Sequence, residues 1–249
     1  LTALSKQLST EVQALDRKKY FTFLSQVYKA LEEKHIQIYL HDDNAQKAIS
    51  DLEYSGEINL STNCETRCFR DIYSLIDANL GVNKSNLYIK RGQEVNITVS
   101  QEIVDHELYV TYENSADLSV GKAGVYKNYA RVLVPTDAIV DGVRLFNGTN
   151  GYDDINFKKN VINNRQEIEF LIEVLPGDKK KIQVVWSVPS NSLASGGEYN
   201  LIVKKQSGTD NDNLLINLLK GDLVLTGGAP AVYTTSLRED FKLKTFFKI

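Results

Sequence analysis

Three polar residues, Asp77, Asn79 and Lys84, are the strongest candidates for chemistry in this sequence. They follow an apolar run over residues 71–77 that predicts a buried strand, and loops that follow buried strands often carry function. Asp77 could accept hydrogen bonds and Lys84 could donate them, so that with the Asn79 amide they could bind a polar or anionic ligand. The structural alternative is that Asp77 and Asn79 close Asx turns while Lys84 pairs with a carboxylate.

Residues suited to general acid–base catalysis are few. His35 and His41 lie on one predicted strand about 20 Å apart, too far to cooperate. His106 lies in a polar segment that we expect to connect two strands. The adjacent pair Asp153 and Asp154 follows Asn-Gly and predicts a turn. No G-x-S-x-G or H-E-x-x-H motif occurs. The sequence therefore predicts no catalytic residue and favours a chain that is not an enzyme, although this question stays open.

The two cysteines, Cys64 and Cys68, are the only ones in the chain. Structural zinc needs about four ligands, and this pair supplies two. A small disulfide suits an exported protein, whereas two free thiols are the alternative. We predict a Cys64–Cys68 disulfide.

The segment from Asp210 to Asn213 resembles the start of a calcium-binding loop. It departs from that pattern because Leu215 occupies the glycine position and Gly221 the position of the bidentate glutamate. We expect instead a hairpin turn between strands near Val203 and Leu214. The sequence predicts neither a metal site nor a cofactor.

The first third of the chain mixes helical and strand patterns. Thr10 and Gln13 match a capping box that opens a predicted helix over residues 11–34. Apolar and polar residues then alternate from His35 to His41, which predicts a strand. Asp43 could cap a further short helix.

From about Asn86 onward the apolar period is almost purely two, which predicts a succession of short strands. The clearest predicted hairpin joins the strands around Phe170 and Trp186 through a Pro-Gly-Asp turn at residues 176–178. We expect the following inward-facing side chains to form the core: Trp186, Val184, Phe170, Ile172, Val132 and Leu201.

These patterns predict an α+β fold with two parts. Residues 1–85 would form a short helix and strand region, the C-terminal part of an upstream α/β domain. Residues 86–249 would form an antiparallel all-β, immunoglobulin-like sandwich.

Charge and hydropathy limit the partners. The net charge of the 249 residues is −3, and basic and acidic residues are mixed along the chain. Nucleic-acid binding needs a basic face, so no nucleic-acid partner is expected. No run reaches the roughly 18–20 apolar residues of a membrane span, so we expect no membrane contact by this chain. Because the chain contains no methionine and begins at Leu1, we expect any anchor or signal to lie upstream.

Four segments in order suggest a family. These are Lys34–Leu40 with Gln46 and Tyr54–Gly56, then Asp77–Lys84, Tyr126–Pro135 and Lys205–Thr209. Together they resemble the C-terminal half of a bacterial family known as domain of unknown function 4012. The resemblance implies an extracytoplasmic body at the cell surface, anchored by an upstream transmembrane segment. It implies no reaction, because the family has no established activity.

Two functions remain as hypotheses. The first is a non-catalytic extracytoplasmic surface module with a structural or binding role, whose partner would be a cell-envelope polymer or a surface protein. The second is an accessory domain of a cell-envelope polymer-processing or transferase enzyme with its active site upstream. The missing catalytic motifs favour the first hypothesis.

Overall fold

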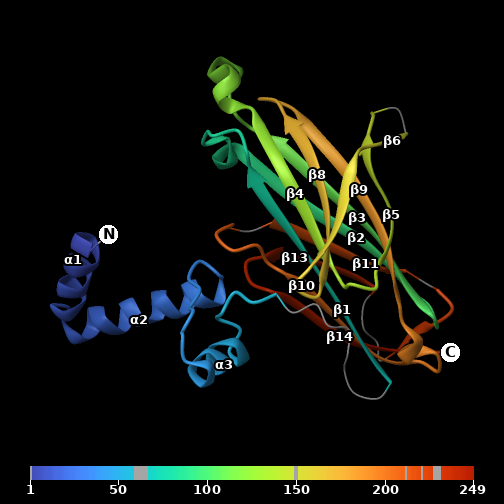
Figure 1. The fold of residues 1–249 in the computed structure, drawn as a ribbon, viewed down its shortest axis with the longest axis horizontal. Coiled ribbons are helices and arrows are strands. Elements are labelled where there is room, and N and C mark those ends of the chain that lie inside the picture. The colour runs from blue at the N-terminus through green and yellow to red at the C-terminus, as the bar shows by residue number, and fades with distance from the viewer. Residues whose placement is uncertain (1, 59–66, 149–150, 211, 220, 227–230) are drawn as a thin grey trace. The chain divides into compact units, whose positions relative to one another are not determined.

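The computed structural model describes residues 2–58, 67–148, 151–210, 212–219, 221–226 and 231–249. The chain forms two compact units, Leu1–Glu57 and Ile58–Ile249 (Figure 1). The first is helical. The second consists mainly of strands in two sheets, so the α+β class is confirmed at this level.

The described part of the first unit has three helices, α1 (Thr2–Gln13), α2 (Arg17–Glu32) and α3 (Asp43–Asp51). The single helix predicted over residues 11–34 is therefore wrong. Helix α1 ends at Gln13. Asp16 caps the next helix, because its side chain accepts a hydrogen bond from the Lys19 amide at 3.0 Å. The predicted capping box does not form, because the Thr10 hydroxyl donates instead to the carbonyl of Lys6 inside α1.

The strand predicted from His35 to His41 is also wrong, because this segment has no regular structure. Ile36 and Leu40 are exposed rather than buried. The Ile38 amide makes one backbone hydrogen bond, to the carbonyl of Tyr54 at 2.9 Å. A strand needs a neighbour that continues the ladder of hydrogen bonds, and no described strand pairs with this segment.

The second unit has two seven-stranded sheets over its described residues, ordered β12-β14-β10-β1-β4-β8-β7 and β13-β11-β2-β3-β9-β5-β6 (Figure 1). We refer to them as sheet A and sheet B. The strands of sheet A are β1 (Cys68–Asn79), β4 (Tyr126–Val134), β7 (Phe157–Ile162), β8 (Arg165–Val174), β10 (Gly197–Lys204), β12 (Val224–Thr226) and β14 (Phe241–Lys248). The strands of sheet B are β2 (Ile89–Val99), β3 (Ile103–Asn114), β5 (Ile139–Phe146), β6 (Tyr152–Asp154), β9 (Lys179–Pro189), β11 (Asp212–Leu219) and β13 (Val232–Leu237). Short 3₁₀ turns are η1 (Ser85–Tyr88), η2 (Leu118–Gly124) and η3 (Asn191–Leu193).

Many connections cross from one sheet to the other. The segment around Gly177 joins β8 of sheet A to β9 of sheet B, so the hairpin predicted there is wrong. The hairpin predicted between the strands near Val203 and Leu214 is wrong for the same reason, because β10 and β11 belong to different sheets. Period-two patterns show which side chains of a strand face inward, but they do not identify the strand's neighbour.

The sheets are mixed rather than purely antiparallel as predicted. β1 pairs with β10 in parallel, and β2 pairs with β11 in parallel. Parallel neighbours need long connections, and here the partners are separated by more than a hundred residues of sequence. Such distant pairing leaves no local signal in the sequence.

One apolar core lies between the two sheets and draws side chains from both. Five of the six predicted core residues, Trp186, Val184, Phe170, Val132 and Leu201, are buried, and Ile172 is partly buried against them. The sandwich-like arrangement therefore follows from the inward face that each strand presents.

The boundary between the two units lies earlier than the predicted one after residue 85. The second unit begins at Ile58, and β1 is an internal strand of sheet A between β10 and β4. Ile72 and Leu133, on the other face of this sheet, form a smaller apolar cluster with Ile58 packed against it. β1 therefore belongs to the sandwich and not to the helical region before it.

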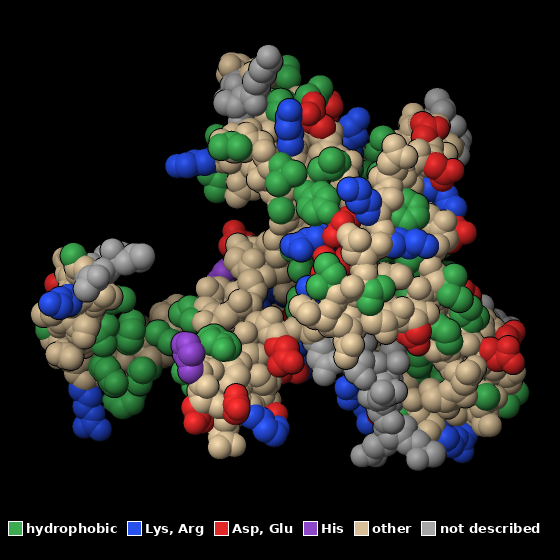
Figure 2. Space-filling view, in the orientation of Figure 1, with side chains coloured by type: hydrophobic (Ala, Val, Ile, Leu, Met, Phe, Trp, Pro, Cys, Tyr) green, Lys and Arg blue, Asp and Glu red, His purple; other side chains and the backbone are tan. Residues whose placement is uncertain are grey.

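In the described part of the chain, no helix has both the length and the apolar character that a membrane crossing requires. Hydrophobic side chains do gather on the surface of the first unit (Figure 2). The exposed ones on α1 and α2 are Leu8, Tyr20, Phe21, Leu24 and Tyr28.

Candidate functional site

Asp77 faces the interior near the end of β1, where it accepts hydrogen bonds at both carboxylate oxygens. Its Oδ1 accepts from the Tyr112 hydroxyl and from the Asn128 amide, each at 2.7 Å. Its Oδ2 accepts from Nη1 of Arg91 at 2.6 Å. The Asp77 side chain is 8% exposed. The carboxylate is therefore held in one orientation by three neighbouring strands.

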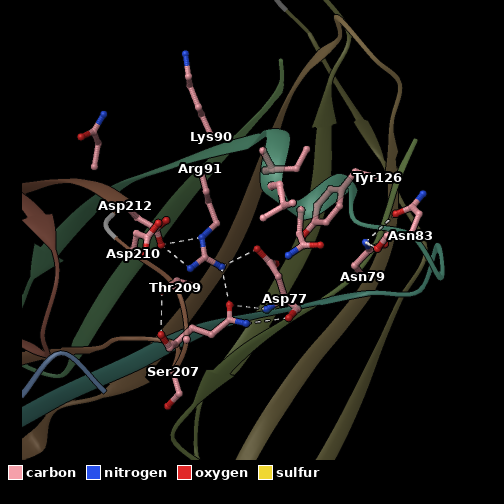
Figure 3. A pocket seen from close by; sticks show the side chains of 16 residues that line it. Asp77, Asn79, Asn83, Lys90, Arg91, Tyr126, Ser207, Thr209, Asp210 and Asp212 are labelled. Carbon is pink, nitrogen blue, oxygen red and sulfur yellow. Dashed lines mark hydrogen bonds and ion pairs between the residues drawn. The ribbon is translucent and has the colours of Figure 1, made fainter. Parts of the chain in front are cut away.

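Arg91 of β2 lies between two carboxylates, Asp77 on one side and Asp212 of β11 on the other (Figure 3). Nε of Arg91 donates to Oδ2 of Asp212 at 2.7 Å, and Nη2 donates to the same oxygen. Nη1 also donates to the side-chain oxygen of Gln206 at 2.9 Å. With 5% of its side chain exposed, Arg91 is a buried cation that two anions compensate.

The electrostatics of this cluster favour its charged form. Burial lowers the pKa of the Arg91 guanidinium, but the neighbouring carboxylates of Asp77 and Asp212 outweigh this effect and raise the pKa above its usual value. Burial, followed by the proximity of Asp77, raises the pKa of the Tyr112 phenol. Tyr112 therefore stays protonated and keeps donating to Asp77.

Gln206 connects the loop after β10 to this cluster through hydrogen bonds of its side chain. Its side-chain oxygen accepts from the Asp77 backbone amide at 3.0 Å, and its side-chain nitrogen donates to the Asp77 carbonyl at 2.9 Å. The Thr209 hydroxyl donates to the backbone carbonyl of Gln206 at 2.9 Å. Segments far apart in sequence are thus joined at one point.

A cavity of about 710 Å³ opens beside this cluster (Figure 3). Its lining is mostly polar: Asp77, Asn79, Asn83, Asn86, Leu87, Ile89, Lys90, Arg91, Tyr126, Gln206, Ser207, Gly208, Thr209, Asp210, Asp212 and Asn213. We call this the Arg91 cavity. Its volume falls in the roughly 300–1,000 Å³ range of small-molecule sites, but its lining is more polar than is usual for them.

Two of the three predicted ligand-binding residues, Asp77 and Asn79, line the Arg91 cavity. Asn79 accepts a hydrogen bond from the Gly81 amide at 2.9 Å, which is the Asx turn of the structural alternative. Its amide nitrogen donates to Asn83 and Ser85, so Asn79 also orders the loop. Lys84 is exposed at the start of η1 and does not line the cavity.

Sequence reasoning missed Arg91, Gln206, Asp212 and Tyr126. The period of two could have found three of them. Arg91 has the same parity as the inward-facing Val95 and Ile97. Asp212 precedes inward-facing Leu214 by two residues, and Tyr126 has the parity of Ala130. A charged or polar residue on an inward strand position indicates a buried polar cluster, although not its partners.

The calcium-like segment serves a different purpose from the one its pattern suggests. Asp212 pairs with Arg91, and Asp210 lies at the rim of the cavity. Among the described residues, no group of three or more His, Cys, Asp or Glu side chains could hold a metal ion. Asn211 lies outside the described residues.

A second polar cluster lies within the core. Nε2 of His106 lies 2.8 Å from Oδ2 of Asp71, and the Tyr199 hydroxyl donates to that same oxygen. The His106 ring stacks on Trp186 with centroids 4.6 Å apart. His106 is completely buried within β3, so the expectation that it lies in a polar connection is wrong. Because its side chain has no exposed surface, His106 is not placed to contact a substrate in this structure.

Cys68 is buried in β1, where the Asn200 amide donates to its sulfur at 3.3 Å. Cys64 lies outside the described residues. The Cys64–Cys68 disulfide therefore stays a prediction.

No family model and no curated protein matches this chain. Among solved structures, a candidate nutrient-binding protein from Legionella pneumophila matches with a TM-score of 0.43 and 9% identity, over 72% of this chain and 70% of that one. An M1 zinc metallopeptidase from Deinococcus radiodurans matches at a TM-score of 0.24 and 8% identity, over 64% of this chain and 38% of that one. The leukotriene A4 hydrolase of Saccharomyces cerevisiae matches with a TM-score of 0.30 and 7% identity, over 66% of this chain and 30% of that one. Similarity this low supports neither a shared fold nor a shared function.

Proposed function

We propose that residues 58–249 form a non-catalytic binding module and that the Arg91 cavity is its site for a small polar ligand. The observation that carries this proposal is the buried Arg91, fixed between Asp77 and Asp212 at one wall of a polar cavity. Such a wall holds its charges in place before a ligand arrives, which reduces the entropy that binding costs.

The position of the cavity on the strands supports binding. Asp77, Arg91, Tyr126 and Asp212 lie on β1, β2, β4 and β11, so both sheets contribute. Side chains on strands are held more precisely than those on loops alone. The loop after β10 closes one side through Gln206.

The same contacts argue against turnover. A general base needs a lone pair directed at a substrate proton, yet both Asp77 oxygens already accept hydrogen bonds. Asp212 shares the Arg91 cation with Asp77. No histidine lines the cavity among the described residues. Asp77 is thus suited to orienting a ligand rather than to taking a proton.

We further propose that the protein is extracytoplasmic, at the cell surface and anchored by an upstream transmembrane segment, with a cell-envelope polymer or a surface protein as its partner. The support is the motif resemblance to domain of unknown function 4012. Three of its segments, Asp77–Lys84, Tyr126–Pro135 and Lys205–Thr209, each contribute residues to the Arg91 cavity. The immunoglobulin-like character of the sandwich also stays a prediction.

The test is a ligand screen by NMR on the ¹⁵N-labelled protein. The panel contains neutral oligosaccharides, cell-wall muropeptides and free amino acids, and each sample is also assayed for product. We expect amide shifts concentrated at Asn86, at Asn213 and at residues 207–209, with no turnover of any compound. Shifts confined to the outer faces of the sheets, or measurable turnover, would contradict the proposal.

A further inference from the structure

We infer that the Arg91 cavity takes a neutral, polyhydroxylated ligand, namely one sugar residue of a glycan, recognised through the Tyr126 hydroxyl and the second carboxylate oxygen of Asp212. This inference rests on the proposed function and names its ligand class. It follows from the polar atoms that the buried cluster leaves without a protein partner.

Tyr126 supplies the first of these atoms. It lines the cavity at 4% exposure, and its hydroxyl makes no hydrogen bond with the described residues. Burial, and then the proximity of Asp77, raises the pKa of this phenol, so the hydroxyl remains a donor. The hydroxyl is not one of the buried polar atoms without a partner, so it is open to the cavity, where a ligand could accept its hydrogen bond.

Asp212 and Arg91 supply two further polar groups that have no partner among the described contacts. Both hydrogen bonds that Asp212 accepts in the described structure go to Oδ2, which leaves Oδ1 as an acceptor in a side chain 9% exposed. A guanidinium has five N–H donors, and four hydrogen bonds engage those of Arg91. One N–H on Nη2 thus stays available among the described contacts. Donors and an acceptor therefore belong to residues that line the same cavity.

Charge disfavours an anion at this wall, because the two carboxylates of Asp77 and Asp212 flank a single guanidinium. An ammonium has no acceptor to offer to Tyr126 or Arg91. A hydroxyl group both donates and accepts, so the hydroxyls of a sugar offer a donor to Asp212 and acceptors to Tyr126 and Arg91.

The rim provides further groups of the same kind. Asn86 and Asn213 line the cavity with side-chain amides, beside the charged Lys90 and Asp210. The two amide side chains are neutral and can each donate and accept. They suit the outer hydroxyls of a sugar and the continuation of a glycan chain into solvent.

The test compares the unaltered protein with Tyr126→Phe by isothermal titration calorimetry. The probes are oligosaccharides of N-acetylglucosamine, glucose, mannose and galactose, with putrescine and inorganic phosphate as ionic probes. At least one oligosaccharide should bind, and binding should weaken about fivefold in Tyr126→Phe, since one hydrogen bond contributes about 1 kcal/mol. Affinity should not change between low and high salt, because the ligand is neutral.

Tyr129→Phe is the matched control, since it removes a hydroxyl from the same strand. The Tyr129 hydroxyl donates to Glu169 at 2.6 Å and does not line the cavity, so oligosaccharide affinity should be unchanged. Thermal unfolding should show Tyr126→Phe to be fully folded, because its hydroxyl makes no contact that the substitution would break.

The outcomes separate this inference from the proposed function. Binding of putrescine or phosphate alone, lost in Tyr126→Phe, would overturn the sugar assignment and leave the cavity as a binding site. Oligosaccharide binding that Tyr126→Phe does not alter would overturn recognition through Tyr126, and the NMR shifts would then decide separately whether the cavity is the binding site. If no probe bound, at millimolar concentration, the sugar assignment would be rejected, and the NMR panel would decide the proposed function separately.

Discussion

Asp71 and Asp77 lie on the same face of one strand, β1, and both point into the interior of the sandwich. Each is held differently. Asp71 is surrounded by His106 and Tyr199 within the core, whereas Asp77 shares the Arg91 cation with Asp212 beside the cavity. A buried carboxylate persists only where hydrogen bonds and opposite charge offset its lost hydration. One strand thus supports a structural cluster and a candidate site.

Arg91→Ala should lower the free energy of unfolding by about 3–5 kcal/mol, because it leaves two buried carboxylates without their cation. Urea denaturation measures this change. Lys90→Ala is the matched control: Lys90 is the exposed neighbour of Arg91 on β2, and its loss should change stability by no more than about 0.5 kcal/mol. Equal stabilities of the two variants would show that the Arg91 cluster contributes little to folding.

Trp186→Ala should cost about 3–5 kcal/mol through the cavity that it leaves in the core. Trp186 is 1% exposed and packs against both the Tyr73 and the His106 rings. The measurement is the urea midpoint at an unchanged denaturant slope. A loss below about 1 kcal/mol would mean that the core collapses around the missing indole.

At the scale of elements, the parallel pair β1 and β10 depends on a close approach at the start of β10. A Cβ atom added at Gly197 would lie 2.2 Å from the carbonyl oxygen of Arg67. This contact is too short, so the backbone would have to move to make room for the methyl group. Gly197→Ala should therefore destabilise the protein by about 1–3 kcal/mol. Gly92→Ala, in the other parallel pair, meets nothing closer than 4.0 Å and should be nearly neutral. Thermal denaturation compares them, and a more stable Gly197→Ala would disprove the close approach.

The segment before β1 carries the predicted Cys64–Cys68 disulfide. A loop this small contributes only about 2 kcal/mol in the chain-entropy description, so the bond would fix a local loop rather than secure the fold. Mass spectrometry after alkylation without reductant should find no modified cysteine. Two alkylated thiols in freshly exported protein would exclude the bond.

On the scale of the whole molecule, the two units should separate cleanly. No residue of α2 or α3 is buried, whereas the second unit has a continuous core between its sheets. A chain beginning at Ile58 should therefore unfold in one cooperative transition at nearly the same temperature as residues 1–249. Circular dichroism on both chains measures this. A fall of more than about 8 °C, beyond what roughly 1–2 kcal/mol causes, would show that the helical unit stabilises the sandwich.

The sequence by itself determined which side chains of the β unit face inward. Alternating apolar positions place Trp186, Val132 and Leu201 in the core, and the same period places Arg91 and Asp212 inward beside them. This succeeds because a strand directs successive side chains to opposite faces whatever its neighbours are. Asp77 and Asn79 could be recognised as candidates for the same local reason, since they end a buried strand.

Only the tertiary structure decided which strands are neighbours, and with that the site. The pairing of β1 with β10 and of β2 with β11 joins residues more than a hundred positions apart, and nothing in either strand's local pattern specifies its partner. That pairing brings Gln206 to Asp77 and Asp212 to Arg91, and it leaves Lys84 outside the cavity. Burial follows from local alternation, whereas a binding site depends on contacts between distant strands.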